Sequence, residues 1–424
     1  MRKITSFIGL ILLSTAAHAA SRSWTDSAGR KVEAEFSGMQ GDSVLLKLAN
    51  GQTVPFPLVR LSAEDQAFAK VQTGSAAPAA STEAKRVPVE KRTWPENVVV
   101  PARSIEIAAT AEKPAERKFI YQSEAFEFTS QAKLAGSVMK EVARTFEATK
   151  SLVEALPWGV QCKPPEGRPR FLAALYETRE DYIAAGGPEL SGGVYFSGDK
   201  IFKIPFQSLG MQKRGQTYFK DDNYNNGTLI HEITHQLMDD YLGFLPKWVV
   251  EGTAEYTEMI PYKSGTFRAD AHKSGIKEDI TEWQQQGFDM DLGSLEKLIT
   301  MTRDQWDAET NSSKTMSAMY HRAHLLVYYF SHLDGDKKGT RFIKFMEAVY
   351  GQVAELRVFF ADPRVKMLEG GRFSYPRDFP PPDMEPNTAP FKSLSILVEE
   401  RPYPKLATEI IEGFKGIGVK LIVR

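Results

Sequence analysis

The stretch over residues 73–95, TGSAAPAASTEAKRVPVEKRTWP, limits how this chain can fold more than any other feature. It is rich in Ala, Ser, Thr and Pro, and its few apolar residues follow no regular period. A segment of this composition buries too little apolar surface to order itself and is typical of a linker. The 424-residue chain is therefore expected to form separate cores on the two sides of it.

The first residues carry the pattern of a cleaved secretory signal. Two basic residues precede an apolar run over 4–13 that is too short to span a bilayer comfortably, and the small-x-small tripeptide AHA follows at 17–19. We interpret residues 1–19 as a signal peptide, with a short N-terminal anchor as the alternative. No other stretch is long and apolar enough to cross a membrane. We therefore expect an exported protein, periplasmic or extracellular, without stable membrane insertion.

The charge argues against a nucleic-acid partner, and the cysteine content excludes an intramolecular disulfide. The formal net charge is −1 and no basic block or tail is present, so we expect no nucleic-acid partner. The one cysteine, Cys162, excludes an intramolecular disulfide. It lies in a Pro/Gly-rich segment, GVQCKPPEG, and we expect it to be structural.

Residues 21–72 have the pattern of a small all-β unit. The alternating run KVEAEF is followed by SVLLKL, by the hairpin signal ANGQ at 49–52, and by TVPFPLV. The segment LSAEDQAFAKV predicts a closing helix with Ser62 as its N-cap and Asp65 three residues later. A unit of this size and pattern favours a small SH3-like barrel.

This unit resembles the homology domain first described in the yeast endocytic adaptor Sla. The recurring frame of that domain is Arg-x-Trp-Thr-Asp, a Gly turn, then Glu-Ala-x-Phe. The resemblance implies an SH3-like fold and a peptide or protein ligand. In yeast the domain binds peptide sorting motifs, but an exported protein would not meet partners of that class. Alternatively, Trp24 and Phe36 only fill the core of the domain. The matching residues are Arg22, Trp24, Thr25, Asp26, Gly29, Glu33, Ala34 and Phe36.

The region over 117–350 alternates strand and helix patterns and predicts an α+β domain with a mixed sheet. Within it, GGVYFSGDKIFKIPF predicts a β-hairpin that turns at 197–200. The tail over 351–424 is Pro-rich at 376–390, and its last part has a β-α-β-like pattern. Later helices are expected over 292–301, 316–333 and 340–350.

The segment GTLIHEITHQLM carries the residues best suited to chemistry. On a helix, His231 and His235 lie one turn apart, about 40° around the axis, so both imidazoles can converge on one metal ion. Glu232 is offset by one position, which keeps it off the metal but within reach of a water bound there. An ordinary helix with two histidines is the alternative, and a third ligand decides between the two.

The segment LPKWVVEGTAEY offers that ligand. Glu251 and Glu255 are four residues apart on a second predicted helix and share one face. One carboxylate can bind the metal while the other accepts a hydrogen bond from a ligand histidine. Spacing alone does not decide which does which. Two histidines and one glutamate form a known catalytic zinc site.

The combination of HEITH with the later WVVEGTAEY resembles the gluzincin metallopeptidases, in particular the thermolysin-type, peptidase MA-like group. The resemblance spans 117–350 and implies a Zn²⁺ site. It implies His231, His235 and Glu251 as ligands, Glu232 as the general base, and Glu255 as the acid that orients a ligand histidine. It also implies that the strand IFKIPF lines the cleft, where its edge would pair with an extended peptide. The substrate-binding residues of that strand would be Phe202, Lys203 and Ile204.

The oxyanion of an amide hydrolysis needs a further stabilising group. Tyr320 and His324 lie four apart in MYHRAHLLVYYF, and we favour Tyr320. A second metal site that combines His321, His324 and His332 is rejected, since three helical turns separate His321 from His332. His272 lies in a polar stretch and is expected at the surface.

These residues favour an exported zinc-dependent peptidase that acts on a peptide or protein substrate. Two alternatives remain open. One is a non-catalytic exported binding protein with a structural zinc site, which would not need Glu232. The other is a zinc hydrolase of non-peptide amides, which the motif does not distinguish from a peptidase.

Overall fold

The computed structural model describes residues 22–26, 30–40, 43–48, 50–62, 65–66, 69 and 86–424, apart from positions 190, 222 and 369–371. The chain divides into two compact units, Met1–Lys85 and Arg86–Arg424. The predicted signal peptide, residues 1–19, lies outside the described residues. No helix in the described part of the chain is long and apolar enough to span a bilayer.

The N-terminal unit is an antiparallel sheet with the order β1-β2-β3-β4. The indole of Trp24 is fully buried in its core and donates to the carbonyl oxygen of Ala34. The expected barrel is not closed among the described residues, because β1 and β4 remain the edges of the sheet. A single bridge between Asp26 and Leu61 brings the two ends together. The strands are β1 (Arg22–Thr25), β2 (Lys31–Gln40), β3 (Ser43–Leu48) and β4 (Thr53–Pro57).

The predicted cap at Ser62 is present. Its Oγ accepts the backbone N–H of Asp65 at 3.2 Å and donates to the Asp65 carboxylate at 3.0 Å. That carboxylate also accepts the N–H of Thr25 at 2.6 Å. The buried carboxylate of Asp65 thus joins Ser62 to the first strand, while much of the predicted closing helix lies outside the described residues.

The predicted linker is too long at its C-terminal end. Residues 86–95 pack on the second unit, while 73–85 lie outside the described residues. Arg86 and Arg92 each place a guanidinium nitrogen 2.6 and 2.5 Å from Glu347. The indole of Trp94 donates to the carbonyl oxygen of Lys338. The composition of the segment could not show this, since each partner lies more than two hundred residues away.

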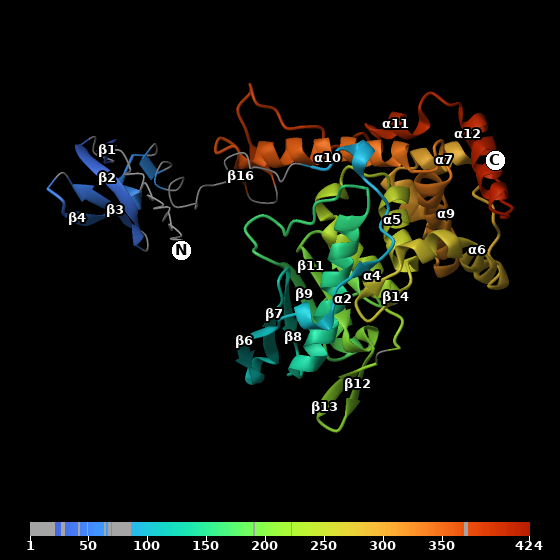
Figure 1. Ribbon diagram of the computed structural model, residues 1–424, viewed down its shortest axis with the longest axis horizontal. Helices are drawn as coiled ribbons and strands as arrows, with labels where there is room; N and C mark the ends of the chain where they lie inside the picture. Colours follow the sequence, from blue (N-terminus) through green and yellow to red (C-terminus); the bar gives the residue numbers. More distant parts are fainter. Residues whose placement is uncertain are drawn as a thin grey trace, which may run out of the picture. The chain divides into compact units, whose positions relative to one another are not determined.

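The second unit is built on a six-stranded mixed sheet with the order β10-β11-β9-β8-β7-β6, which confirms the α+β class (Figure 1). Strands β8, β9 and β11 are parallel neighbours and the outer strands are antiparallel. Helix α2 (Gly136–Ala155) packs on β8, where Phe146 meets Phe126 and Phe128 edge-on. The strands are β6 (Ala108–Lys113), β7 (Lys118–Gln122), β8 (Phe126–Ser130), β9 (Phe171–Tyr176), β10 (Val194–Phe196) and β11 (Ile201–Pro205).

The helices that follow the sheet form a second layer (Figure 1). Helix α5 packs along α9, and Gly252 makes the close approach possible, since a Cβ there would lie 2.5 Å from the carbonyl oxygen of Ala323. Helix α4 packs against both α2 and α5. These helices include α4 (Gly227–Leu237), α5 (Lys247–Met259), α6 (Ala269–Gln285), α7 (Leu295–Thr300), α8 (Arg303–Glu309), α9 (Ser313–His332) and α10 (Thr340–Ala361). The short helix α3 (Arg179–Ala184) instead lies between β9 and β10 in the sequence.

The β-α-β-like end predicted for the tail is wrong in its first element. The segment SLSILVEE forms α11 (Leu394–Val398), whose Leu394 and Leu397 are buried beside α10. A short apolar run does not separate strand from helix, and the spacing of three between these leucines suits the helix. Helix α12 (Tyr403–Gly416) is present and contacts α7 and α9, so residues 351–424 belong to the same compact unit.

Short hairpins complete the second unit. One of them, β14 and β15, also pairs with β5. These strands are β5 (Val98–Val99), β12 (Met211–Arg214), β13 (Thr217–Lys220), β14 (Tyr262–Lys263), β15 (Thr266–Phe267), β16 (Lys366–Met367) and β17 (Phe373–Ser374).

Candidate metal centre

The core fixes the two helices that carry the predicted site. On α4, Ile230, Ile233 and Leu237 form the expected buried stripe. On its inner side the hydroxyl of Thr234 is hydrogen-bonded to that of Thr257 on α5 at 2.7 Å, in a buried contact. This contact holds α4 and α5 in a fixed register.

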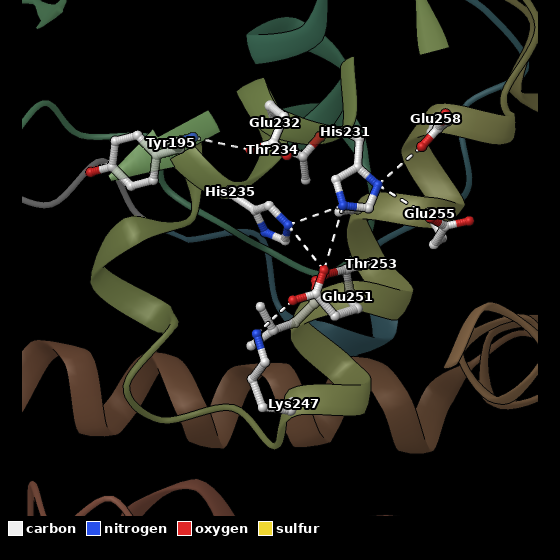
Figure 2. Close-up of polar contacts among 12 residues, drawn as sticks. Tyr195, His231, Glu232, Thr234, His235, Lys247, Glu251, Thr253, Glu255 and Glu258 are labelled. Carbon is white, nitrogen blue, oxygen red and sulfur yellow. Dashed lines mark hydrogen bonds and ion pairs between the residues drawn. The ribbon is translucent and has the colours of Figure 1, made fainter. Parts of the chain in front are cut away.

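Three side-chain atoms of these helices converge on one point (Figure 2). The Nε2 atoms of His231 and His235 are 3.1 Å apart. Oε2 of Glu251 lies 3.5 Å from the first nitrogen and 3.3 Å from the second. The prediction that the two histidines and Glu251 come together agrees with this geometry, and these atoms form a group that could hold a metal ion.

The triangle can be compared with the size of a zinc site. Bonds of about 2.0–2.1 Å at tetrahedral angles separate two ligand atoms by about 3.3–3.4 Å. The three observed separations, 3.1, 3.3 and 3.5 Å, bracket that value. The donor set, two imidazoles and one carboxylate, is also one that zinc accepts. The residues present therefore fit a zinc ion.

The far side of His231 contacts two carboxylates instead of the one predicted. Its Nδ1 lies 3.0 Å from Glu258 and 3.4 Å from Glu255. A hydrogen at Nδ1 leaves the lone pair on Nε2, on the side of Glu251. Sequence reasoning missed Glu258, although Glu251, Glu255 and Glu258 follow the spacing i, i+4, i+7 that marks one helical face.

The second oxygen of Glu251 has a partner of its own. Oε1 accepts a hydrogen bond from Nζ of Lys247 at 2.6 Å. Burial by itself raises the pKa of Glu251, but Lys247, His235 and His231 outweigh it and hold that pKa well below its ordinary value. Glu251 is thus an ionised carboxylate in a buried place.

Glu232 stands beside the three converging atoms, as its offset on the helix predicts. Its Oε2 accepts the backbone N–H of Tyr195 in β10 at 3.0 Å (Figure 2). Burial raises the pKa of Glu232, and the two histidines oppose that shift. The carboxylate therefore lies between the candidate metal centre and the edge of the sheet.

The predicted substrate strand is not an edge strand. β11 is paired on both sides, with β10 and with β9, so its backbone has no free edge for a peptide. Phe202 and Ile204 are buried in the core, and Nζ of Lys203 is bound to Asp199 and to the carbonyl oxygen of Ala185. The periodicity of IFKIPF did show a strand, but sheet order depends on partners that the segment does not contain. The edge is β10.

The aromatic ring of Tyr320 lies parallel to that of His231, with centroids 5.8 Å apart, so α9 brings it to the site as predicted. His324 lies elsewhere: it is fully buried, and its ring packs on Tyr256 and His272. His272 is buried too, contrary to the surface position expected from its polar neighbours. Among the described residues, each group that could hold a metal contains His231.

The comparisons with known proteins bear on the N-terminal unit alone. No curated protein matches the chain. Residues 14–77 match the family of the SLA1 homology domain 1, which agrees with the resemblance seen in Arg22, Trp24 and Phe36. The N-terminal unit is therefore similar to that domain.

Proposed function

We propose that this chain is an exported zinc-dependent peptidase whose second unit has the zincin arrangement of a mixed sheet and an active-site helix. One observation carries the proposal. Nε2 of His231, Nε2 of His235 and Oε2 of Glu251 converge at the spacing of a zinc site, with the carboxylate of Glu232 next to them. Export is proposed from the signal pattern of residues 1–19.

His231, His235 and Glu251 would hold the zinc ion. When bound, zinc supplies a Lewis acid that polarises the scissile carbonyl and activates a water for attack. With these three residues as its ligands, the ion would still have room for that water. A structural zinc site would fill the fourth position with a protein side chain.

Glu232 would act as the general base. Its carboxylate accepts the proton of the attacking water and delivers it to the nitrogen of the leaving amine. The hydrogen bond from Tyr195 holds Oε2, which fixes the orientation of the carboxylate and leaves the other oxygen for the proton. A structural zinc site has no use for an acid at this offset.

The edge of β10 would position the substrate. The N–H of Tyr195 points to Glu232, away from β11, and in an antiparallel pair the carbonyl of the same residue points the same way. An extended peptide that pairs with β10 would therefore lie beside Glu232. Tyr320, stacked on His231, is the group we assign to the oxyanion.

The decisive test is Glu232→Gln, which keeps the shape of the side chain and removes the proton acceptor. We expect casein hydrolysis to fall by roughly a hundredfold or more, with about one zinc per chain retained by elemental analysis. A chelator should abolish the wild-type activity and added zinc should restore it. Zinc without casein or peptide hydrolysis in the wild type would contradict the proposal and favour a structural site or a non-peptide amide substrate.

A further inference from the structure

The partner of the second Glu251 oxygen is the feature that the proposed function does not use. We infer that Lys247 is a positioning residue, which holds Glu251 to one metal-binding oxygen and so keeps the fourth position of the ion open. The inference rests on the proposed function. It concerns the ammonium group that contacts the second oxygen of the candidate ligand.

The two oxygens of Glu251 have different neighbours (Figure 2). Oε2 faces the Nε2 atoms of His231 and His235, at 3.5 and 3.3 Å. Oε1 faces Nζ of Lys247, at 2.6 Å. Lysine carries three donors and no acceptor, so it can occupy a carboxylate oxygen but, while protonated, cannot bind a metal.

A carboxylate without such a partner can bind a cation through both oxygens. At this site, a second bond from Glu251 would take the position that a water needs. The hydrogen bond from Lys247 makes that second bond costly, because the ammonium would have to leave Oε1 first. It would also draw electron density from the carboxylate, so that a bound ion would be the stronger Lewis acid.

Helix stability does not explain the pair. Lys247 is the first residue of α5 and Glu251 is four residues later. A lysine before a glutamate is the less favourable order at this spacing. A cation at a helix N-terminus also opposes the helix dipole. The contact nevertheless has a short distance, and the Lys247 and Glu251 side chains are only 18% and 5% exposed. The place of this pair beside the candidate metal centre suits a role in positioning Glu251.

The experiment compares three proteins after cobalt(II) is substituted for zinc. In the wild type we expect the strong visible absorption of a four-coordinate ion. In Lys247→Met, a neutral side chain of similar length, we expect weaker bands of higher coordination, zinc still bound, and kcat lowered by roughly 10–100-fold with little change in KM. Lys247→Arg, which keeps the positive charge, should restore the wild-type spectrum and most of the activity.

A matched control is Lys297→Met. Lys297 and Glu309 form a pair at the same 2.6 Å, but with side chains 60% and 44% exposed on α7 and α8. This variant should change neither spectrum nor rate.

The outcomes separate the inference from the proposed function. Wild-type protein that binds neither zinc nor cobalt contradicts the proposed function itself. Wild-type binding with an unchanged cobalt spectrum in Lys247→Met overturns the inference alone, whatever happens to the rate. If Lys247→Met does not fold, Lys247→Leu is measured in the same way, because its shorter side chain also carries neither a charge nor a hydrogen-bond donor. A four-coordinate spectrum in that variant likewise overturns the inference.

Discussion

Nδ1 of His231 lies closer to Glu258, at 3.0 Å, than to Glu255, at 3.4 Å. Both acids are on α5, the helix that also carries Glu251. The shorter contact favours Glu258 as the acceptor for the Nδ1 hydrogen, so we expect Glu258 to contribute more than Glu255 to the orientation of this ring.

The first prediction compares these two acids. Glu258→Gln should weaken zinc binding by roughly 10–100-fold, because the amide no longer offers a charged acceptor to Nδ1. Glu255→Gln should weaken it less, since its contact with the ring is longer. Competitive zinc titration of both apo-proteins measures the difference. The reverse ranking would return the orienting role to Glu255.

The second prediction concerns the third ligand. Glu251→Ala should lose tight zinc binding altogether, as should His235→Ala, because each removes one of the three converging atoms. Elemental analysis after dialysis against a metal-free buffer checks this. Stoichiometric zinc in Glu251→Ala would show that the ion is held by other residues.

Part of this site was predictable because its geometry is local. His231, Glu232 and His235 occupy one helix, and the angular spacing of a helix is fixed by the backbone. Glu251 required a second helix, whose distance from α4 depends on packing. The choice between Glu251 and Glu255 therefore came from a resemblance, not from spacing.

The incorrect predictions for β11 and His272 have a common physical cause. The residues of β11 predict a strand and the hairpin with β10, but whether β11 keeps a free edge depends on β9, an earlier strand that pairs with its other side. His272 appeared exposed because its chain neighbours are polar, whereas its ring is covered by Tyr256 from another helix. In both cases the deciding contacts come from distant parts of the chain, which local periodicity does not report.

The third prediction tests the contact between α5 and α9. Gly252→Ala should destabilise the protein by about 1–3 kcal/mol, since its Cβ would lie 2.5 Å from the carbonyl oxygen of Ala323 and 2.7 Å from Cγ2 of Val327. Gly351→Ala, inside α10, meets no atom within 4 Å and should be neutral or slightly stabilising. Chemical denaturation compares them. Equal stability of the two variants would show that α9 moves aside without cost.

The fourth prediction is a pH dependence. A hydrogen bond from Tyr218, with further support from Lys213 and Arg117, lowers the pKa of Glu177 to about 2 from 4.5. Because the folded state has the lower pKa, this stabilisation is complete above pH 4.5 and is lost as the pH falls toward 2. Glu177→Gln should therefore lower the free energy of unfolding at pH 7, and the difference from wild type should shrink near pH 2. A difference that stays constant with pH would contradict the assignment.

The last prediction concerns where the second unit begins. A fragment over 86–424 keeps Trp94, whose ring lies 4.5 Å from that of His332 on α9 and 5.8 Å from that of Tyr256 on α5. A fragment over 96–424 loses this ring and leaves Glu347 without its two arginine partners. We expect both fragments to fold, but the shorter one to melt at a lower temperature.

Because Tyr256 is on the same helix as Glu251, the shorter fragment should also bind zinc more weakly. Trp94→Ala in the longer fragment should reproduce much of both effects, whereas Arg103→Ala, at an exposed position in the same fragment, serves as the control. Equal melting temperatures and equal zinc affinities of the two fragments would show that residues 86–95 act only as a linker. A lower melting temperature with unchanged zinc affinity would restrict their role to stability.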